Sequence, residues 1–443
     1  MFKFRLLSIF FTTLALTGCS SGSGDDSEIV SVTSDTSSTE RLNIAIINNG
    51  HMINMMSVAE AYTDQTGIAL NWVTLNEDTL RNQVTSAPIT DGSQYDVINI
   101  GMQEAPFWGA AGWIEPLIFS DEYDVEDVFP AMREGLSNSG TLHAAPFYGE
   151  SSMLMYRSDL ANSAAVLIDD NDSWRNVEAA AAAMHNPEEG VYGICLRGRP
   201  GWGDNIALLA TIANSFGAVW FDKDNRPQLD STQWNEATNF YVDILNNYGP
   251  PNPERNSFNE NLTLFNDGSC GMWIDATIAA SFIALDEVAY AQSPNGGNPI
   301  GANWLWAWAM AVPAGTPNTE EAMKFIEWAT SKEYIQTVGN SPNFGWGSVP
   351  TGTRTSTYAI PEFQEVARFA AAEKIAIDTA APSPTDAKPY LGVQFVSIPE
   401  FPEIGSALGQ EIAAALIGSK SVEEALADAQ ETADQIMQDA GYY

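Results

Sequence analysis

Two carboxylates in this chain have surroundings that suit ligand chemistry. Glu150 lies in a glycine turn, and Asp275 ends an apolar run that reads GMWID. Each could accept hydrogen bonds from two adjacent hydroxyl groups, and charged acceptors make the stronger hydrogen bonds. A pair of carboxylates about 5–10 Å apart is also the machinery of a glycosidase. The two residues therefore suggest either binding of a hydroxyl-rich ligand or hydrolysis of a glycoside.

Three tryptophans alternate along the segment 303–313, which reads NWLWAWAMAVP. Side chains alternate between the two faces of a strand, so Trp304, Trp306 and Trp308 share one face. Three indoles in a row either fill a core or form a wall on which an apolar face of a ligand stacks. The alternation alone favours core filling and leaves both roles open.

Signals for metal, nucleotide or nucleophile chemistry are weak. The sequence has three histidines, His51, His143 and His185, and they lack metal-ligand spacing. It shows no nucleophile elbow, and no glycine pattern resembles a dinucleotide or phosphate loop. We therefore predict a binding protein that is not an enzyme and needs neither metal nor cofactor.

The elements that must position these residues begin as alternating strands and helices. Near-continuous apolar strands are predicted at 42–47, 68–73 and 95–100, and helices at 52–66 and 77–85. This alternation favours an α/β unit with a parallel sheet, which binds ligands beyond the carboxyl ends of its strands. Asn49, His51 and Glu104 follow these strands, although His51 also begins a helix.

The alternation restarts after residue 150. The predicted strands are 153–156, 192–196 and 271–275, and the predicted helices are 173–184, 206–216, 231–246, 257–266, 276–285, 319–331, 403–416 and 422–440. A turn-forming run exposes Arg199 and Trp202, and Asn205 suits the N-cap of the helix that follows. We expect two α/β lobes that the chain crosses more than once.

The charge of the chain excludes some partners. With 19 Lys and Arg against 57 Asp and Glu, the formal net charge is −38. Such a field repels nucleic acid and disfavours anionic ligands at long range. Solubility in a salty medium explains this acidity better than a cationic ligand does, because salt screens the self-repulsion.

The first 40 residues are typical of an export signal followed by a tether. A basic start, an apolar run too short to span a membrane and the sequence LTGC at residues 16–19 match a bacterial lipoprotein signal, in which Cys19 is lipidated. An ordinary cleaved secretory signal is the alternative. Residues 20–40 are rich in Ser, Thr, Asp and Gly, so they are predicted to be disordered. We expect an exported protein of the periplasm or cell envelope, anchored to a membrane by lipid.

Two cysteines remain after Cys19. Cys195 and Cys270 both lie in predicted strands, and an oxidising compartment permits them to pair. A cross-link between neighbouring strands and two free buried thiols are both left open.

Several short runs, in this order and spacing, resemble one family along nearly the whole of residues 41–443. They are NNG at 48–50, PFYGESS at 146–152, GICLRG at 193–198, PGWG at 200–203, GMWIDAT at 271–277, the tryptophan segment and PTGTR at 350–354. The chain resembles the solute-binding proteins of ATP-binding-cassette (ABC) importers for carbohydrates (extracellular solute-binding protein family 1). Within them it is most similar to the sorbitol/mannitol (polyol) binding branch.

The resemblance implies a periplasmic-binding-protein fold of the α/β class, in which crossover hinge strands join two lobes around a ligand cleft. It implies lobe 1 at 41–148 plus 310–372 and lobe 2 at 149–309 plus 373–443. The implied partners are a sugar alcohol or small sugar and the permease subunits of the importer, and the protein is expected to be a monomer. Hinge closure would capture the ligand.

The resemblance also implies that the tryptophan segment ends near a passage between the two lobes. With it we expect Trp304 to pack inside and Trp306 or Trp308 to meet a ligand.

Hydroxyl-rich ligands need carboxylates or amides for their hydroxyls and aromatic rings for their C–H faces. The predicted ligand-binding residues are Asn49, His51, Glu104, Tyr148, Glu150, Arg199, Trp202, Asn205, Trp220, Asp275, Trp306, Trp308, Arg354 and Gln394. Trp174, Trp234 and Trp328 lie at apolar positions of helices and are expected in the core. An oligosaccharide-capturing surface lipoprotein and, less favoured, a glycoside hydrolase using Glu150 and Asp275 are the alternatives.

Overall fold

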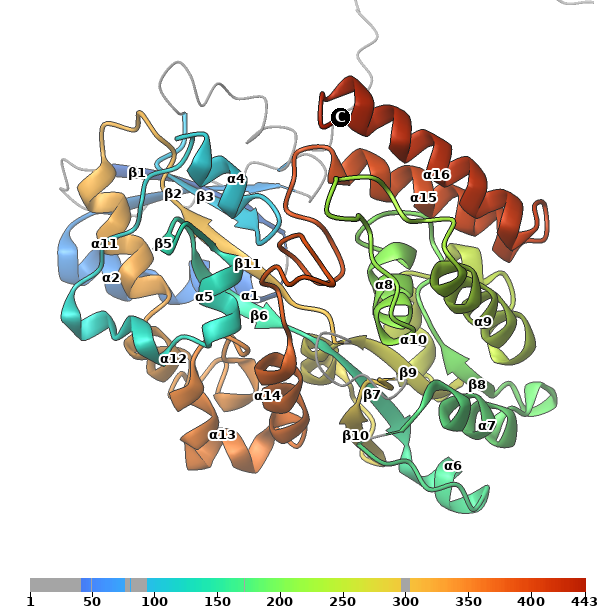
Figure 1. Ribbon diagram of the computed structural model, residues 1–443. Helices are drawn as coiled ribbons and strands as arrows, with labels where there is room; N and C mark the ends of the chain where they lie inside the picture. The colour runs from blue at the N-terminus through green and yellow to red at the C-terminus, as the bar shows by residue number, and fades with distance from the viewer. Residues whose placement is uncertain (1–40, 49, 76–79, 81–93, 171, 296–302) are drawn as a thin grey trace, which may run out of the picture.

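The computed structural model describes residues 41–48, 50–75, 80, 94–170, 172–295 and 303–443. It forms two α/β lobes that lie side by side (Figure 1). Residues 1–40, with the expected signal and tether, and most of the helix expected at 77–85 lie outside the described residues. The expected two-lobed α/β architecture is confirmed.

The first lobe is built on a five-stranded sheet of order β2-β1-β3-β11-β6. Its strands are β1 (Arg41–Ile47), β2 (Ala69–Leu75), β3 (Val97–Gly101), β6 (Ala145–Glu150) and β11 (Trp306–Ala311). The helices of this part are α1 (Gly50–Val58), α2 (Glu60–Thr66), α4 (Ala105–Ala110), α5 (Pro130–Gly135), α11 (Thr319–Ala329), α12 (Lys332–Gly339) and α13 (Pro361–Val366). A short hairpin joins β4 (Ser137–Asn138) to β5 (Thr141–Leu142).

The second lobe is built on a four-stranded sheet of order β10-β7-β9-β8. Its strands are β7 (Ser152–Arg157), β8 (Tyr192–Cys195), β9 (Cys270–Ala276) and β10 (Val288–Gln292). Its helices are α6 (Ser158–Ser163), α7 (Trp174–Met184), α8 (Asn205–Ser215), α9 (Thr232–Tyr248), α10 (Phe258–Asn266), α15 (Phe401–Leu416) and α16 (Val422–Asp439). Helix α14 (Ala370–Thr379) packs against β7 and β10 of this lobe and against α5 of the first.

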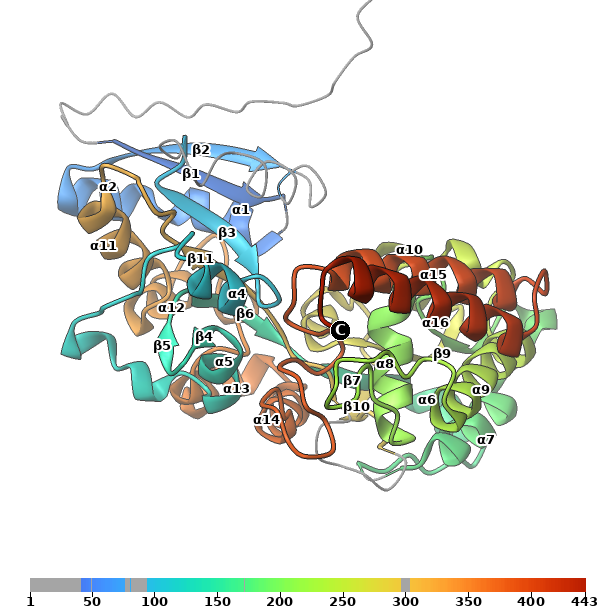
Figure 2. The same cartoon turned by 45° about the horizontal axis from the view of Figure 1, so that its top comes forward.

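Both sheets are mixed rather than purely parallel. Strands β2, β1 and β3 are parallel, as their apolar runs predict, but β11 is antiparallel to both β3 and β6. The chain leaves the first lobe through β6 and returns through β11, so these two strands run in opposite directions. Figure 2 shows the passage from β6 to β7 between the lobes. Ser151 is the one residue between the two strands.

Two local predictions differ from the structure. The helix expected at 276–285 is a 3-10 helix, η5 (Thr277–Phe282), and the chain is irregular again before β10. The tryptophan strand begins only at Trp306, and its register shifts between Trp308 and Ala309. A disulfide joins Cys195 at the end of β8 to Cys270 at the start of the neighbouring β9, which is one of the two alternatives left open.

Candidate functional site

A cavity of about 480 Å³ lies between the two lobes. The first lobe contributes residues that end or follow β1 or belong to β6 and β11: Ile47, Asn48, Gly50, His51, Tyr148, Glu150, Trp306 and Trp308. The second lobe contributes Arg197, Trp202, Gly203, Ala207, Phe258, Asn259, Leu262, Ala276, Ile278 and Phe282. Trp304 and Gln394 complete the lining from the segments that connect the lobes. Seven of the fourteen predicted ligand-binding residues line this cavity.

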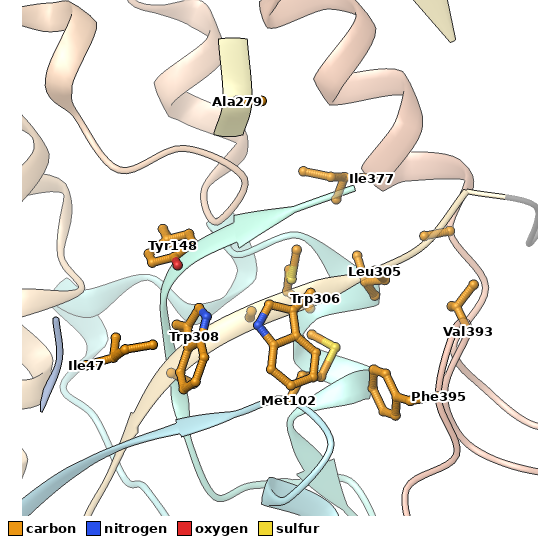
Figure 3. Close-up of a cluster of buried hydrophobic side chains, with 14 of the residues drawn as sticks. Ile47, Met102, Tyr148, Ala279, Leu305, Trp306, Trp308, Ile377, Val393 and Phe395 are labelled. Carbon is orange, nitrogen blue, oxygen red and sulfur yellow. The ribbon is translucent and has the colours of Figure 1, made fainter. Parts of the chain in front are cut away.

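An indole wall forms one side of the cavity. Trp306 and Trp308 project to the same side of β11 with their ring centroids 5.7 Å apart, and Tyr148 lies beside Trp308 (Figure 3). Trp202 of the second lobe meets Trp306 edge to face at 5.6 Å. Gly101 makes room for this packing, because a Cβ there would lie 2.3 Å from the Trp306 ring. The alternation of the sequence thus produces a wall that faces the cavity.

Trp304 also lines the cavity, although the sequence predicts that it packs inside. Its side chain is nearly fully buried and contacts a small cluster formed by Ala207, Ala276 and Ile278. The guanidinium of Arg197 lies 5.4 Å from its ring. Trp304 lies outside the strand, so the period-two rule does not set its direction. It acts as core and as cavity wall at once.

Arg197 brings a fixed positive charge to the cavity. Its Nε and Nη2 donate to the Asp275 carboxylate at 2.6–3.1 Å, and its Nη1 donates to the Gly203 carbonyl at 2.7 Å. Burial lowers the pKa of Arg197, but the charges of Asp275, Asp204 and Glu150 outweigh this effect and raise the pKa above its ordinary value. These contacts with described residues use three of the five N–H bonds, which leaves one on Nη1 and one on Nη2 for a ligand.

Asp275 is fully buried and does not line the cavity. Its carboxylate accepts hydrogen bonds from Arg197, from the Trp273 indole N–H at 3.0 Å and from the backbone N–H of Ala276 at 2.7 Å. The structure therefore does not place Asp275, which was predicted to bind the ligand, at the surface of the cavity. It holds Arg197, and Arg197 is the residue that faces the ligand space.

His51 presents a neutral ring to the cavity. It is 6% exposed, its ring centroid lies 5.3 Å from that of Tyr148, and its Nε2 has no hydrogen-bond partner among the described residues. Burial lowers its pKa to about 4, and a hydrogen bond to the backbone of Ser348 offsets only part of this change. Gln394 also lines the cavity, and its Oε1 accepts from the backbone N–H of Leu305 at 3.0 Å.

The two other arginines predicted for the site lie outside the cavity lining. Arg354 is fully buried in the first lobe, where it donates to the Thr330 carbonyl and pairs with Asp127. The Arg199 side chain is 49% exposed and pairs with Asp204. The sequence identified arginines near turns but could not show which of them points inward.

Asn205 and Trp220 have structural roles. Asn205 is the first residue of α8 rather than its N-cap. Its amide donates to the Gly409 carbonyl and its Oδ1 accepts from the Gly201 N–H. Trp220 packs edge to face against Trp234 at 4.9 Å in the core. The Gly409 carbonyl lies 204 residues from Asn205 along the chain, and Trp220 also packs against the distant Phe401 at 5.0 Å, so the sequence pattern did not reveal these roles.

Glu104 and Asn49 complete the predicted set. Glu104 is buried at the start of α4, next to Gly101 and behind the indole wall, and it does not line the cavity. Asn49 lies outside the described residues.

The sequence missed several lining residues. Asn48 directly follows β1 and Arg197 follows β8, so the rule that sites form at the carboxyl ends of strands points to both. Phe258, Asn259 and Phe282 come from α10 and η5. No sequence signal identifies these three, because the packing of the second lobe alone brings them to the cavity.

None of the described helices combines the length and the apolarity needed to cross a membrane. Within the same part of the chain, no three His, Cys, Asp or Glu side chains are grouped so that they could hold a metal ion.

Comparison with known proteins gives consistent results. Residues 50–336 match the family described as bacterial extracellular solute-binding protein. A mannitol-binding protein of Pseudomonas aeruginosa is 41% identical over 414 residues, which cover 91% of this chain and 94% of the relative.

Solved structures agree in fold. An ABC transporter solute-binding protein of Agrobacterium vitis with bound D-mannitol superposes with a TM-score of 0.85 at 46% identity, over 91% of this chain and 99% of that one. A solute-binding protein of Agrobacterium radiobacter in complex with ribitol gives a TM-score of 0.77 at 21% identity, over 90% and 99% of the two chains, which shows the fold alone. The resemblance drawn from the motif runs is confirmed: the chain belongs to the bacterial extracellular solute-binding protein family.

Proposed function

We propose that this protein captures a sorbitol- or mannitol-like polyol, or a small sugar, and delivers it to the permease of an ABC importer. The observation that carries the proposal is the composition of the interlobe cavity. A wall of indoles faces one fixed guanidinium and one carboxylate, and the mannitol-binding relative is 41% identical over nearly the whole chain.

The cavity matches the chemistry of a polyol. The two remaining N–H bonds of Arg197 can donate to neighbouring hydroxyls, and a two-donor fork suits a vicinal diol. Glu150 supplies a charged acceptor, and Nε2 of His51, which has no partner in the part of the chain that the structure describes, supplies a neutral polar atom. Trp306 and Trp308 offer apolar faces to the C–H groups between the hydroxyls.

The same geometry argues against hydrolysis by the predicted carboxylate pair. A glycosidase needs both carboxyl groups at the scissile bond. Glu150 lines the cavity, but Asp275 lies behind Arg197 and already accepts several hydrogen bonds. Binding without turnover therefore fits these residues better.

Export, anchoring and lobe limits are part of the proposal. The LTGC sequence supports lipidation of Cys19, with residues 20–40 as a tether above the membrane of the periplasm or envelope. For the lobes we propose limits a few residues away from the expected 41–148 plus 310–372 and 149–309 plus 373–443, because β6 ends at Glu150 and β11 begins at Trp306. The sheet membership of β6, β7 and β11 supports crossings at Ser151 and near residues 303–305. We propose that the protein acts as a monomer.

Titration calorimetry on the mature chain with mannitol, sorbitol, arabitol, glucose and maltose tests the proposal. We expect saturable one-to-one binding of at least one polyol or monosaccharide, and no product from incubated aryl glycosides. The variant Arg199→Ala is the matched control, because that arginine lies outside the cavity lining and its affinity should equal that of the wild type. Absence of any binder, or release of glycoside product, would refute the function.

A further inference from the structure

Phe282 occupies an unusual position at the boundary between the cavity and solvent. It lines the cavity, yet it is 41% exposed. Within the described part of the chain, it is the one lining residue that is also a large, exposed apolar side chain. A single exposed apolar side chain needs no explanation by itself. The contacts that Phe282 makes across the cleft are what distinguish it.

The ring of Phe282 reaches across the cleft. Phe282 ends η5 in the second lobe, and its ring atoms lie 3.6 Å from the point that a Cβ of Gly50 would occupy. Gly50 begins α1 in the first lobe, and the neighbouring His51 ring lies 6.4 Å from the Phe282 ring. The two lips of the cavity thus meet at Phe282.

The first-lobe lip is apolar on its outer side as well. Ile53 follows Gly50 by three positions in α1 and therefore lies on the same face of the helix. It is 40% exposed, as Phe282 is on the opposite lip. A Cβ at Gly50 would lie in ordinary van der Waals contact with the phenyl ring, so the ring already packs close to α1.

The backbone around Phe282 is fixed. The Asn266 amide at the end of α10 donates to the Phe282 carbonyl at 3.1 Å, and its Oδ1 accepts from the backbone N–H of Ala284 at 2.9 Å. One side chain therefore holds the segment on both sides of Ile283. The ring projects from an anchored turn and not from a loose loop.

We propose that Phe282 is a size-limiting gate that closes one end of the ligand site against α1. The inference rests on the proposed function and deepens it by naming the ligand class, which is a single polyol or monosaccharide unit. A ligand with a further sugar unit at this end must displace the ring, because solvent lies beyond it. Gly50 and His51 form the surface against which the gate closes.

Paired affinities for a short and a long ligand test the gate. Dissociation constants for mannitol and for maltitol, which is a polyol carrying one extra glucose unit, are measured by calorimetry. The proteins are the wild type, Phe282→Ala, Phe282→Leu and Leu167→Ala. Leu167 is 87% exposed and does not line the cavity, so its variant is the control for loss of a surface apolar side chain. Circular dichroism and thermal unfolding establish that each variant is folded.

The ratio of the maltitol to the mannitol dissociation constant is the readout. We expect it to exceed 10 in the wild type and in Leu167→Ala, and to fall more than threefold in Phe282→Ala. Phe282→Leu keeps apolar bulk, so its ratio should lie between those of the wild type and Phe282→Ala. This variant serves as the test if Phe282→Ala does not fold. The dissociation rate of mannitol should rise in Phe282→Ala.

Three results would overturn the gate. They are a ratio in Phe282→Ala within threefold of the wild type, equal wild-type affinity for both ligands, and an equal change in Leu167→Ala. In each case the wild type still binds mannitol or another short ligand, so the proposed function stands without the gate. A wild type that binds no polyol or sugar refutes the proposed function, and the gate with it.

Discussion

The substitution Asp275→Asn tests most directly whether Asp275 acts by holding Arg197 in position. The wild-type carboxylate holds Arg197 through Nε and Nη2 and also accepts from Trp273 and Ala276. An asparagine of the same shape carries no charge, and its amide nitrogen faces an N–H donor. Arg197, whose side chain is 12% exposed, then keeps its charge without a counterion at contact distance.

The expected cost follows from the burial of the pair. Removal of one partner of a buried ion pair costs about 3–5 kcal/mol, because the remaining charge is left desolvated and unpaired. Urea unfolding followed by tryptophan fluorescence and circular dichroism should show a loss of this size in Asp275→Asn. Binding should weaken by about 1–3 kcal/mol, because Arg197 no longer presents its two remaining N–H bonds in a fixed direction.

A double-mutant cycle separates this mechanism from direct ligand contact. If Asp275 acts through Arg197, the pair Arg197→Met and Asp275→Asn should be strongly non-additive, with the double variant more stable than the sum of the single losses predicts. Additive stability losses would refute the coupling. Full wild-type affinity in Asp275→Asn would show that the orientation of Arg197 does not matter for the ligand.

Three further predictions concern other parts of the chain. Burial raises the pKa of Glu373 to about 7 despite hydrogen bonds from Tyr358 and other hydroxyls, so folding is favoured by its protonation below pH 4.5 and this stability is lost as the pH rises through 7. A rise in pKa from 4.5 to about 7 corresponds to about 3 kcal/mol, and Glu373→Gln should flatten the pH dependence of the unfolding free energy by that amount; an unchanged profile would contradict the assignment. The double variant Cys195→Ser and Cys270→Ser should lose about 4 kcal/mol of stability in urea unfolding, since the disulfide closes a loop of 75 residues, and equal stability with and without reductant would refute this. Arg354→Met should lower the unfolding midpoint but leave the ligand affinity unchanged, because Arg354 pairs with Asp127 away from the cavity. Weaker ligand binding by the folded variant would show that Arg354 contributes to the binding site.

Sequence reasoning succeeded where a residue's role depends on its neighbours in the chain. The apolar runs gave the strands β1, β3 and β7, and the alternation of indoles placed Trp306 and Trp308 on one face. Glu150 and Tyr148 reached the cavity because they end the strand that leads out of the first lobe. In each case a period-two rule or a strand end was sufficient.

Prediction from the sequence failed where the role of a residue depends on contacts between segments that are distant along the chain. Asp275 is suited to bind hydroxyls, but β8 and β9 lie side by side in the folded sheet and bring Arg197 against its carboxylate. Trp220 and Asn205 have types that suit a sugar site, yet each meets a partner from elsewhere in the second lobe. The residue type limits the roles that a side chain can have, and the contacts of that side chain in the folded protein select one of these roles.

The sequence by itself determined the family, the two-lobed α/β class and the row of indoles at the cleft, because short motifs and local periodicity are properties of the chain. Only the tertiary structure decided that Arg197 rather than Asp275 faces the ligand space, that Arg354 is buried in the first lobe and that Phe282 reaches Gly50 across the cleft. The physical reason is that burial and charge pairing are set by segments that become neighbours on folding, and their distance along the chain carries no information about that.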